Sequence, residues 1–238
     1  MLFTYNTAAA GKSLHTAAKN VKKRRRPAGL GLAPLRRMYE QKYCAANDGN
    51  ISCRSSEGGF WVTPSGVSKG FLTDEMLIKV DADGNILEAN EGYKCSSEVK
   101  LHLKVYSERP EMNAVVHAHP PVSTAFACAR KDLDTPVVTE AILSLGTVPC
   151  APFAVPGSPE LAETIVPYLN GHAACLLANH GVLTWGESLV QAYYRMETTE
   201  YYANLLILTG QAPVPTHVLD EEEHAAVLKA RSTWGIKF

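Results

Sequence analysis

The sequence predicts one mixed α/β domain, and two patterns support that fold class. Short runs of β-branched and aromatic residues alternate with longer stretches that carry helix start and stop signals. Tight-turn residues separate the first strands, which favours antiparallel pairing. With 238 residues and 46% hydrophobic content, the chain is long enough to build a large core without disulfides.

Composition narrows the range of partners and locations. The net charge of −1 gives no reason to expect nucleic acid or an anionic membrane as a partner. No apolar run reaches the roughly 20 residues that cross a bilayer. The six cysteines are dispersed and form no C-x-x-C pair, a pattern typical of reduced thiols in a cytoplasmic protein. We therefore expect a cytoplasmic protein that binds neither nucleic acid nor membrane.

The N-terminal segment, residues 1–34, differs from the rest. It contains the basic run 22–26, and residues 1–26 contain no acid. Such a run is more often a solvated tail than a nuclear-import or polyanion-binding tract. Without an amphipathic pattern, a mitochondrial presequence has little support. We expect residues 1–34 to be disordered or poorly packed and residues 35–238 to form the folded domain.

The first half of that domain is predicted to contain a helix followed by four short strands. The helix begins near Leu35, and the turn pair Asp48-Gly49 precedes the first strand. A turn around Gly84 favours a hairpin between the last two strands. The expected ranges are a helix at 35–39 and strands at 50–52, 60–63, 77–81 and 86–87.

The second half alternates helices with buried strands. Ser96 is a favoured N-cap, Pro159 stands at the first position of a helix, and Gly210 ends a long one. Residues 137–149 show no clear period and are expected to be a strand and loop region. The expected ranges are helices at 96–107, 122–129, 158–169, 188–209 and from 220, with strands at 114–119, 174–178 and 182–185.

Two histidines, His117 and His119, end the predicted strand 114–119. Residues i and i+2 of a strand project from the same face, and Pro120 cannot continue the hydrogen-bonded ladder. Two neighbouring imidazoles suit a divalent transition metal, which needs further ligands. On this pair alone, hydrogen-bonded histidines at a strand end are an equally open interpretation.

A third histidine and an acid complete a candidate metal site. His180 follows the buried strand 174–178, and Gly181 allows close backbone approach. Three imidazoles with an open position are typical of a catalytic metal site. Glu98 could occupy that position at rest and act as a base once substrate displaces it. Without the histidines, Glu98 is more simply an acid that stabilises a helix N-terminus, and His102 on the same helix is expected to be structural.

Hydroxyl and backbone N–H donors cluster in three further segments. Turns and helix N-termini of this kind bind phosphate, although each alone is more often an ordinary turn or cap. The segments are Gly49-Asn50, Ser65-Gly66 and Ser96-Ser97.

Together these motifs resemble the class II aldolase/adducin head-domain family and, within it, most closely the fuculose-1-phosphate aldolase branch. The resemblance extends over roughly residues 38–238. The motifs that carry it, in family order, are Gly49-Asn50-Ile51-Ser52, Thr63-Pro64-Ser65-Gly66, Ser96-Ser97-Glu98, His117-Ala118-His119 and Asn179-His180-Gly181.

The resemblance implies a three-layer αβα domain around a central, mainly antiparallel sheet. It also implies Zn²⁺, or another divalent transition metal, on His117, His119 and His180, with Glu98 as resting ligand and general base. Relatives are typically homotetramers with active sites between neighbouring subunits. The positions that match the family's substrate-phosphate site are Asn50, Ser65, Gly66, Ser96 and Ser97.

The implied activity is that of an aldolase. It would cleave a ketose 1-phosphate, either L-fuculose 1-phosphate or a deoxypentulose 1-phosphate, to dihydroxyacetone phosphate and an aldehyde through a metal-stabilised enediolate. The alternatives are an L-ribulose-5-phosphate 4-epimerase, a methylthioribulose-1-phosphate dehydratase and a non-catalytic adducin-like module. Glu98 argues against the epimerase, which usually has aspartate there, and the retained histidines argue against the module.

Two positions depart from the fuculose-type pattern, in which tyrosines handle the aldehyde. Glu140, or Thr139 after a one-residue shift, stands at one tyrosine position, and Trp234 stands at the other. An indole cannot protonate an alkoxide as a phenol can, and Glu140 adds a carboxylate instead. We therefore assign Glu140 and Trp234 to the aldehyde side and leave the aldehyde and its stereochemistry open.

Overall fold

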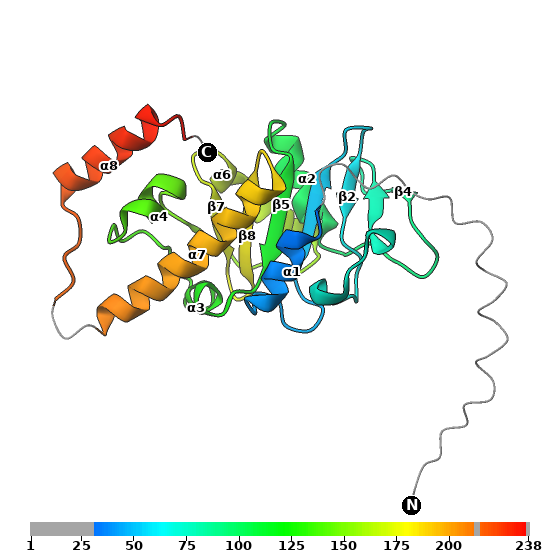
Figure 1. Cartoon of the computed structure of the whole chain (residues 1–238), viewed down its shortest axis with the longest axis horizontal. Helices are drawn as coiled ribbons and strands as arrows, with labels where there is room; N and C mark the ends of the chain where they lie inside the picture. The colour runs from blue at the N-terminus through cyan, green and yellow to red at the C-terminus, as the bar shows by residue number, and fades with distance from the viewer. Residues whose placement is uncertain (1–30, 212–214, 237–238) are drawn as a thin grey trace, which may run out of the picture.

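An eight-stranded sheet with helices on both faces forms the centre of the computed structural model (Figure 1). The structure describes residues 31–211 and 215–236. The strand order is β4-β3-β2-β1-β5-β8-β7-β6, and every pair of neighbours is antiparallel except β6 with β7. The strands are β1 (Asn50–Arg54), β2 (Phe60–Val62), β3 (Ile78–Val80), β4 (Ile86–Glu88), β5 (Ala114–Ala118), β6 (Cys150–Ala151), β7 (Ala174–Leu177) and β8 (Gly181–Gly186).

Two groups of helices cover the two faces, so the expected three-layer αβα architecture is confirmed. On one face lie α1 (Ala33–Glu40), α3 (Pro121–Ala129) and the long α7 (Leu189–Gly210). On the other lie α2 (Val99–Glu108), α5 (Pro159–Thr164) and α6 (Val166–Leu169). Helix α4 (Thr139–Ser144) packs against α7 and α8 (Glu221–Thr233). In the described part of the chain, no helix has the length and apolar character needed to cross a membrane.

Side chains along β5 alternate between the two faces of the sheet and pack into two separate hydrophobic cores. Ala114 and Val116 pack in the core under α1 and α7, whereas Val115 packs in the core under α2. Because strand side chains alternate between faces, His117 lies on the same face as Val115. His117, a candidate metal ligand, therefore faces the α2 side of the sheet.

The elements differ from expectation in two places. Residues 137–149, expected to be strand and loop, contain the six-residue helix α4, and the short strand β6 begins only at Cys150. The helix expected from Ser96 begins at Val99, with Glu98 at its N-cap position. The Ser96 hydroxyl does not cap the helix, but it accepts a hydrogen bond of 3.3 Å from the Glu98 backbone N–H.

The expected N-terminal segment, residues 1–34, lies almost entirely outside the described residues. Of these positions only 31–34 are described, and Ala33 already belongs to α1. Helix α1 starts two residues before the boundary expected at residue 35, and the division of the chain at that point stays a prediction.

Candidate active site

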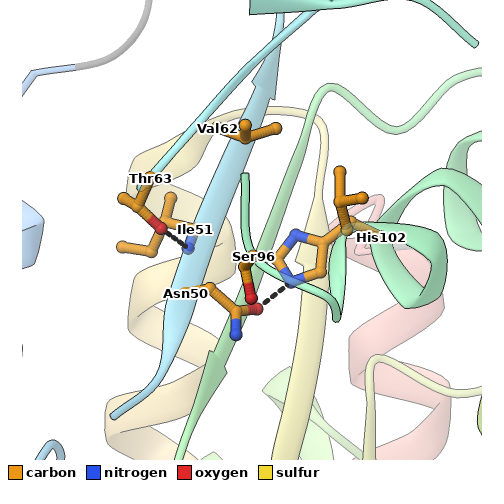
Figure 2. Close-up of a pocket in the computed structure, with 7 residues that line it drawn as sticks. Asn50, Ile51, Val62, Thr63, Ser96 and His102 are labelled. Atoms are coloured by element: carbon orange, nitrogen blue, oxygen red, sulfur yellow. Dashed lines mark hydrogen bonds between the residues drawn. The ribbon is translucent and has the colours of Figure 1, made fainter. Parts of the chain in front are cut away.

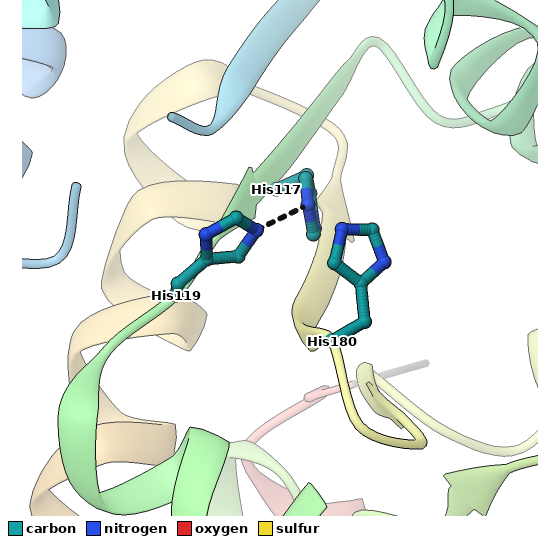
Figure 3. A group of neighbouring side chains, drawn as sticks. All are labelled: His117, His119 and His180. Carbon is teal, nitrogen blue, oxygen red and sulfur yellow. Dashed lines mark hydrogen bonds between the residues drawn. The ribbon is translucent and has the colours of Figure 1, made fainter. Parts of the chain in front are cut away.

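Three imidazoles meet at one end of β5 (Figure 3). His117 belongs to β5, His119 follows that strand directly, and His180 stands in the turn between β7 and β8. One ring nitrogen of each lies within 4.8 Å of the corresponding nitrogen of the others. The structure thus brings together the three histidines that the sequence motifs singled out.

Glycine at position 181 makes this approach of chains sterically feasible. A Cβ on Gly181 would lie 2.5 Å from the carbonyl oxygen of Ala118 and 2.5 Å from Cδ2 of His119. Both distances are far below van der Waals contact, so any larger residue would push β8 away from β5. The expected role of Gly181 in permitting close backbone approach is therefore consistent with the packing.

Polar contacts at Nδ1 orient the rings of His117 and His119 so that the Nε2 atoms of the two rings approach each other. His117 Nδ1 donates a 2.9 Å hydrogen bond to the carbonyl of Val182, and His119 Nδ1 lies 3.6 Å from Oδ2 of Asp48. The Nε2 atoms of His117 and His119 are then only 3.1 Å apart. Burial lowers the pKa of both histidines below the usual value, so the rings are neutral and present lone pairs. Neutral imidazole is the form that binds metal ions.

Glu98 completes this cluster from the N-terminus of α2. Its Oε1 lies 3.1 Å from Nε2 of His180, and its Oε2 lies 3.5 Å from Nε2 of His117. Burial alone would raise the pKa of Glu98, but the two histidines and a hydrogen bond from Asn50 outweigh it and hold the pKa below its ordinary value. The three imidazoles and this carboxylate form a donor set that fits a divalent transition metal.

A chain of hydrogen bonds runs from Glu98 into the core, and Figure 2 shows its link between Asn50 and His102. Asn50 Nδ2 donates to Glu98 Oε2 at 2.6 Å, and Asn50 Oδ1 accepts from Nε2 of His102 at 2.5 Å. The other ring nitrogen of His102 accepts from the Ser52 hydroxyl at 2.7 Å, which itself accepts from Tyr106 at 2.8 Å. Burial lowers the pKa of His102 to about 4, so this ring is neutral near pH 7. The chain fixes which end of the Asn50 amide faces Glu98.

Strand pairing places this network beside the histidines. In the register of β1 and β5, Asn50 lies directly opposite His117, so the two side chains share a face of the sheet. His102 and Tyr106 follow Glu98 along α2 at intervals of four residues and therefore share a face of that helix. His102 is buried and hydrogen-bonded, which agrees with the structural role expected from the sequence. One of its hydrogen-bond partners, Asn50, belongs to the candidate site.

A cavity of about 240 Å³ lies in front of the cluster. It contains all five residues at the positions that match the family's phosphate site, together with Glu98, His119 and His180. Sequence reasoning did not assign three other residues of its wall; one of them, Asp48, had been noted only as half of a turn pair. The described residues that line it are Asn47, Asp48, Gly49, Asn50, Pro64, Ser65, Gly66, Ser96, Ser97, Glu98, His119, Pro156 and His180.

The two aldehyde-side candidates do not line this cavity. Glu140 stands in the first turn of α4, and Trp234 follows α8 with 64% of its surface exposed. Helices α4 and α8 pack against each other, at the end of the molecule where α8 is drawn in red in Figure 1. Within one chain these two residues are therefore separate from the metal-site cluster.

Three curated proteins illustrate the similarity to characterised sequences. The L-fuculose phosphate aldolase of Methanococcus maripaludis is 35% identical over 71% of this chain and 90% of its own length. The 3-oxo-tetronate 4-phosphate decarboxylase of Escherichia coli K12 is 34% identical over 74% and 84%. The 5-methylthioribulose-1-phosphate/5-deoxyribulose-1-phosphate aldolase of Escherichia coli O45:K1 is 32% identical over 87% and 95%. The second of these names a reaction that the sequence motifs did not suggest.

The fold agrees with these similarities. A solved structure of an L-fuculose 1-phosphate aldolase superposes with a TM-score of 0.76 at 29% identity, over 84% of this chain and 93% of that one. The model of the class II aldolase and adducin N-terminal domain matches residues 32–207. This chain belongs to the class II aldolase and adducin N-terminal domain family.

Proposed function

We propose that the protein is a metal-dependent aldolase that cleaves a ketose 1-phosphate to dihydroxyacetone phosphate and an aldehyde. One observation carries this proposal: a carboxylate and two of three convergent imidazoles line the same cavity as the hydroxyl and backbone donors of three turns. The candidate substrates are L-fuculose 1-phosphate and a 5-deoxypentulose 1-phosphate. Relatives named for both substrates support them.

The metal in this proposal is Zn²⁺ or another divalent transition metal, held by His117, His119 and His180 with Glu98 as resting ligand. When bound, it polarises the substrate carbonyl and stabilises the negative charge of the enediolate. The donor set supports zinc, because imidazole nitrogen and carboxylate oxygen are both common zinc ligands.

The chain itself supplies the base and the anchor for the substrate. Glu98, freed by the incoming substrate, removes or returns the proton at the carbon next to the carbonyl. The hydrogen bond from Asn50 holds one of its oxygens in place. The phosphate is bound by N–H and hydroxyl donors of Asn50, Ser65, Gly66, Ser96 and Ser97, which hold the reacting carbons near Glu98.

We also infer a cytoplasmic homotetramer with its active sites at subunit interfaces. Glu140 and Trp234 lie away from the cavity of their own chain, and Trp234 is largely exposed. In a symmetric assembly such residues can reach the cavity of a neighbouring subunit. There they would contact the aldehyde part of the substrate.

A second candidate is decarboxylation of a phosphorylated 3-oxo acid, the reaction named for one of the relatives. Loss of CO₂ from such an acid also leaves negative charge next to a carbonyl, so the same electrophile and phosphate anchor would serve. The epimerase and dehydratase remain weaker alternatives, and a non-catalytic module has no use for four convergent metal-binding groups.

A substrate panel tests the proposal. Ketose 1-phosphates, ribulose 5-phosphate and a 3-oxo 4-phospho acid are each incubated with the zinc-loaded protein, and dihydroxyacetone phosphate and CO₂ are measured. We expect dihydroxyacetone phosphate from a ketose 1-phosphate, loss of activity with a chelator and recovery with added zinc. Release of CO₂ alone would support the decarboxylase, and turnover that survives complete metal removal would contradict both reactions.

A further inference from the structure

A buried lysine lies behind the proposed phosphate pocket. Lys69 begins the short 3-10 helix 69–71, directly after the turn that carries Ser65 and Gly66, and only 1% of its surface is exposed. A lysine is seldom fully buried unless its charge is paired. Among the described residues, however, no carboxylate forms an ion pair with it.

Two backbone carbonyls hold the ammonium group instead. Lys69 Nζ donates to the carbonyl of Asn47 at 2.7 Å and to that of Val67 at 3.0 Å. Asn47 lies in the turn between Ala45 and Asp48 that precedes Asn50, and Val67 follows Gly66. The two bonds therefore connect two loops that both contribute residues to the cavity wall.

The cavity wall carries no positive side chain of its own. Among the described residues that line it there is no lysine or arginine, whereas Asp48 and Glu98 both contribute carboxylates. A phosphate ester carries up to two negative charges at neutral pH, so two wall acids alone would repel it. Burial lowers the pKa of Lys69, and the carboxylates of Asp48 and Glu98 oppose that shift. The ammonium group is therefore within electrostatic reach of both acids.

We propose that Lys69 positions the two loops of the phosphate pocket and supplies a positive charge that favours a phosphorylated substrate. It acts through the carbonyls of Asn47 and Val67 and through its field, not by touching the phosphate. This inference rests on the proposed phosphate site. It adds a residue that determines specificity for the anion and that lies outside the motifs shared with the family.

The test measures binding of inorganic phosphate to the full-length, zinc-loaded protein by calorimetry, together with the KM and kcat for the sugar phosphate. Lys69→Met keeps the aliphatic stem and removes the charge and both bonds. We expect its phosphate Kd and its KM to rise by about tenfold or more, with zinc content unchanged and kcat reduced much less. Lys69→Arg, which keeps the charge, should retain more of the affinity than Lys69→Met.

Lys79 provides a matched control. It is also buried, with 6% of its surface exposed, but it lies on β3 beside Glu57, Glu88 and the ring of Trp61. Lys79→Met should lower thermal stability and leave phosphate affinity unchanged. If Lys69→Met does not fold, Lys69→Gln, which keeps N–H donors without the charge, replaces it.

The outcomes distinguish a failure of the role proposed for Lys69 from a failure of the proposed phosphate site. Folded Lys69 variants without the charge that bind phosphate within about twofold of the wild type would overturn the role of Lys69, as would an equal loss in Lys79→Met. A wild-type protein that does not bind phosphate would overturn the phosphate site itself and, with it, this inference.

Discussion

Within one chain, the cluster of Glu98, His117, His119 and His180 forms a candidate site, whereas the end of the molecule formed by α4 and α8 does not. At the cluster, Glu98, three histidines and Asn50 are largely buried and in mutual contact. At the other end, Glu140 and Trp234 are exposed and line no cavity with them. The comparison teaches that one chain preorganises the groups proposed for proton transfer. The residues proposed for the aldehyde side, Glu140 and Trp234, are not held in place by the core that holds those groups.

The largest expected effect is the loss of a metal ligand. His119→Ala should abolish bound zinc and lower activity by about a thousandfold, because a bound metal supplies several kcal/mol of charge stabilisation. Zinc content is measured by elemental analysis beside turnover. His217→Ala, at an exposed histidine far along the chain, serves as control and should change neither. Activity that survives in His119→Ala without bound metal would remove the histidines from the proposed mechanism.

Replacing the base tests the same cluster without removing the imidazoles. Glu98→Gln should retain zinc and reduce proton exchange at the dihydroxyacetone phosphate carbon by about a hundredfold or more, which is typical of a lost general base. Exchange is followed by NMR in deuterated water. Glu108→Gln, at the far end of α2 and half exposed, is the matched control. Unchanged exchange in Glu98→Gln would assign the base role to another group.

The pH dependence of the free energy of unfolding tests whether His102, in the hydrogen-bond network behind Asn50, is buried in its neutral form. The pKa of His102 is about 4 in the folded protein, against 6.5 for an ordinary histidine. Between these values the unfolded chain binds more protons, so the free energy of unfolding should fall by about 3 kcal/mol as the pH drops from 6.5 to 4.

Denaturant unfolding of the metal-free protein at several pH values measures this fall. His117 and His119 contribute in the same direction, because burial lowers the pKa of each. His102→Gln should therefore remove only part of the pH dependence. A variant with the full wild-type dependence would show that His102 has the same pKa in the folded and the unfolded protein.

The smallest expected effect is at the aldehyde side. Trp234→Ala should lower activity by about tenfold, the equivalent of a single lost contact of 1.4 kcal/mol, with zinc content unchanged. Mixed oligomers of Trp234→Ala and His119→Ala chains should recover activity, because some interfaces then combine an intact cluster with an intact Trp234. Purified mixed oligomers that are no more active than the parents would place the aldehyde side within one chain.

The sequence predicted best the helices and strands whose hydrophobic pattern and residue spacing indicate the same element. The sequence predicted both β5, which contains His117 and is followed by His119, and the long helix α7 to within about two residues. Helix α4 was missed because six residues carry too little periodicity, and its formation depends on packing against α7 and α8. The role of Lys69 was also invisible, because its partners are backbone carbonyls that any sequence could supply.

The pairing of Asn50 with His117 has a consequence for folding. The two residues are 67 positions apart, yet they lie opposite each other in the register of β1 and β5. A slip of one residue would turn Asn50 and Ser52 to the α7 face and leave Glu98 without its partner. Long-range strand pairing forms slowly, so the site becomes competent only when this register is complete. Zinc uptake during refolding would therefore report the arrival of the native register and could be used to time it.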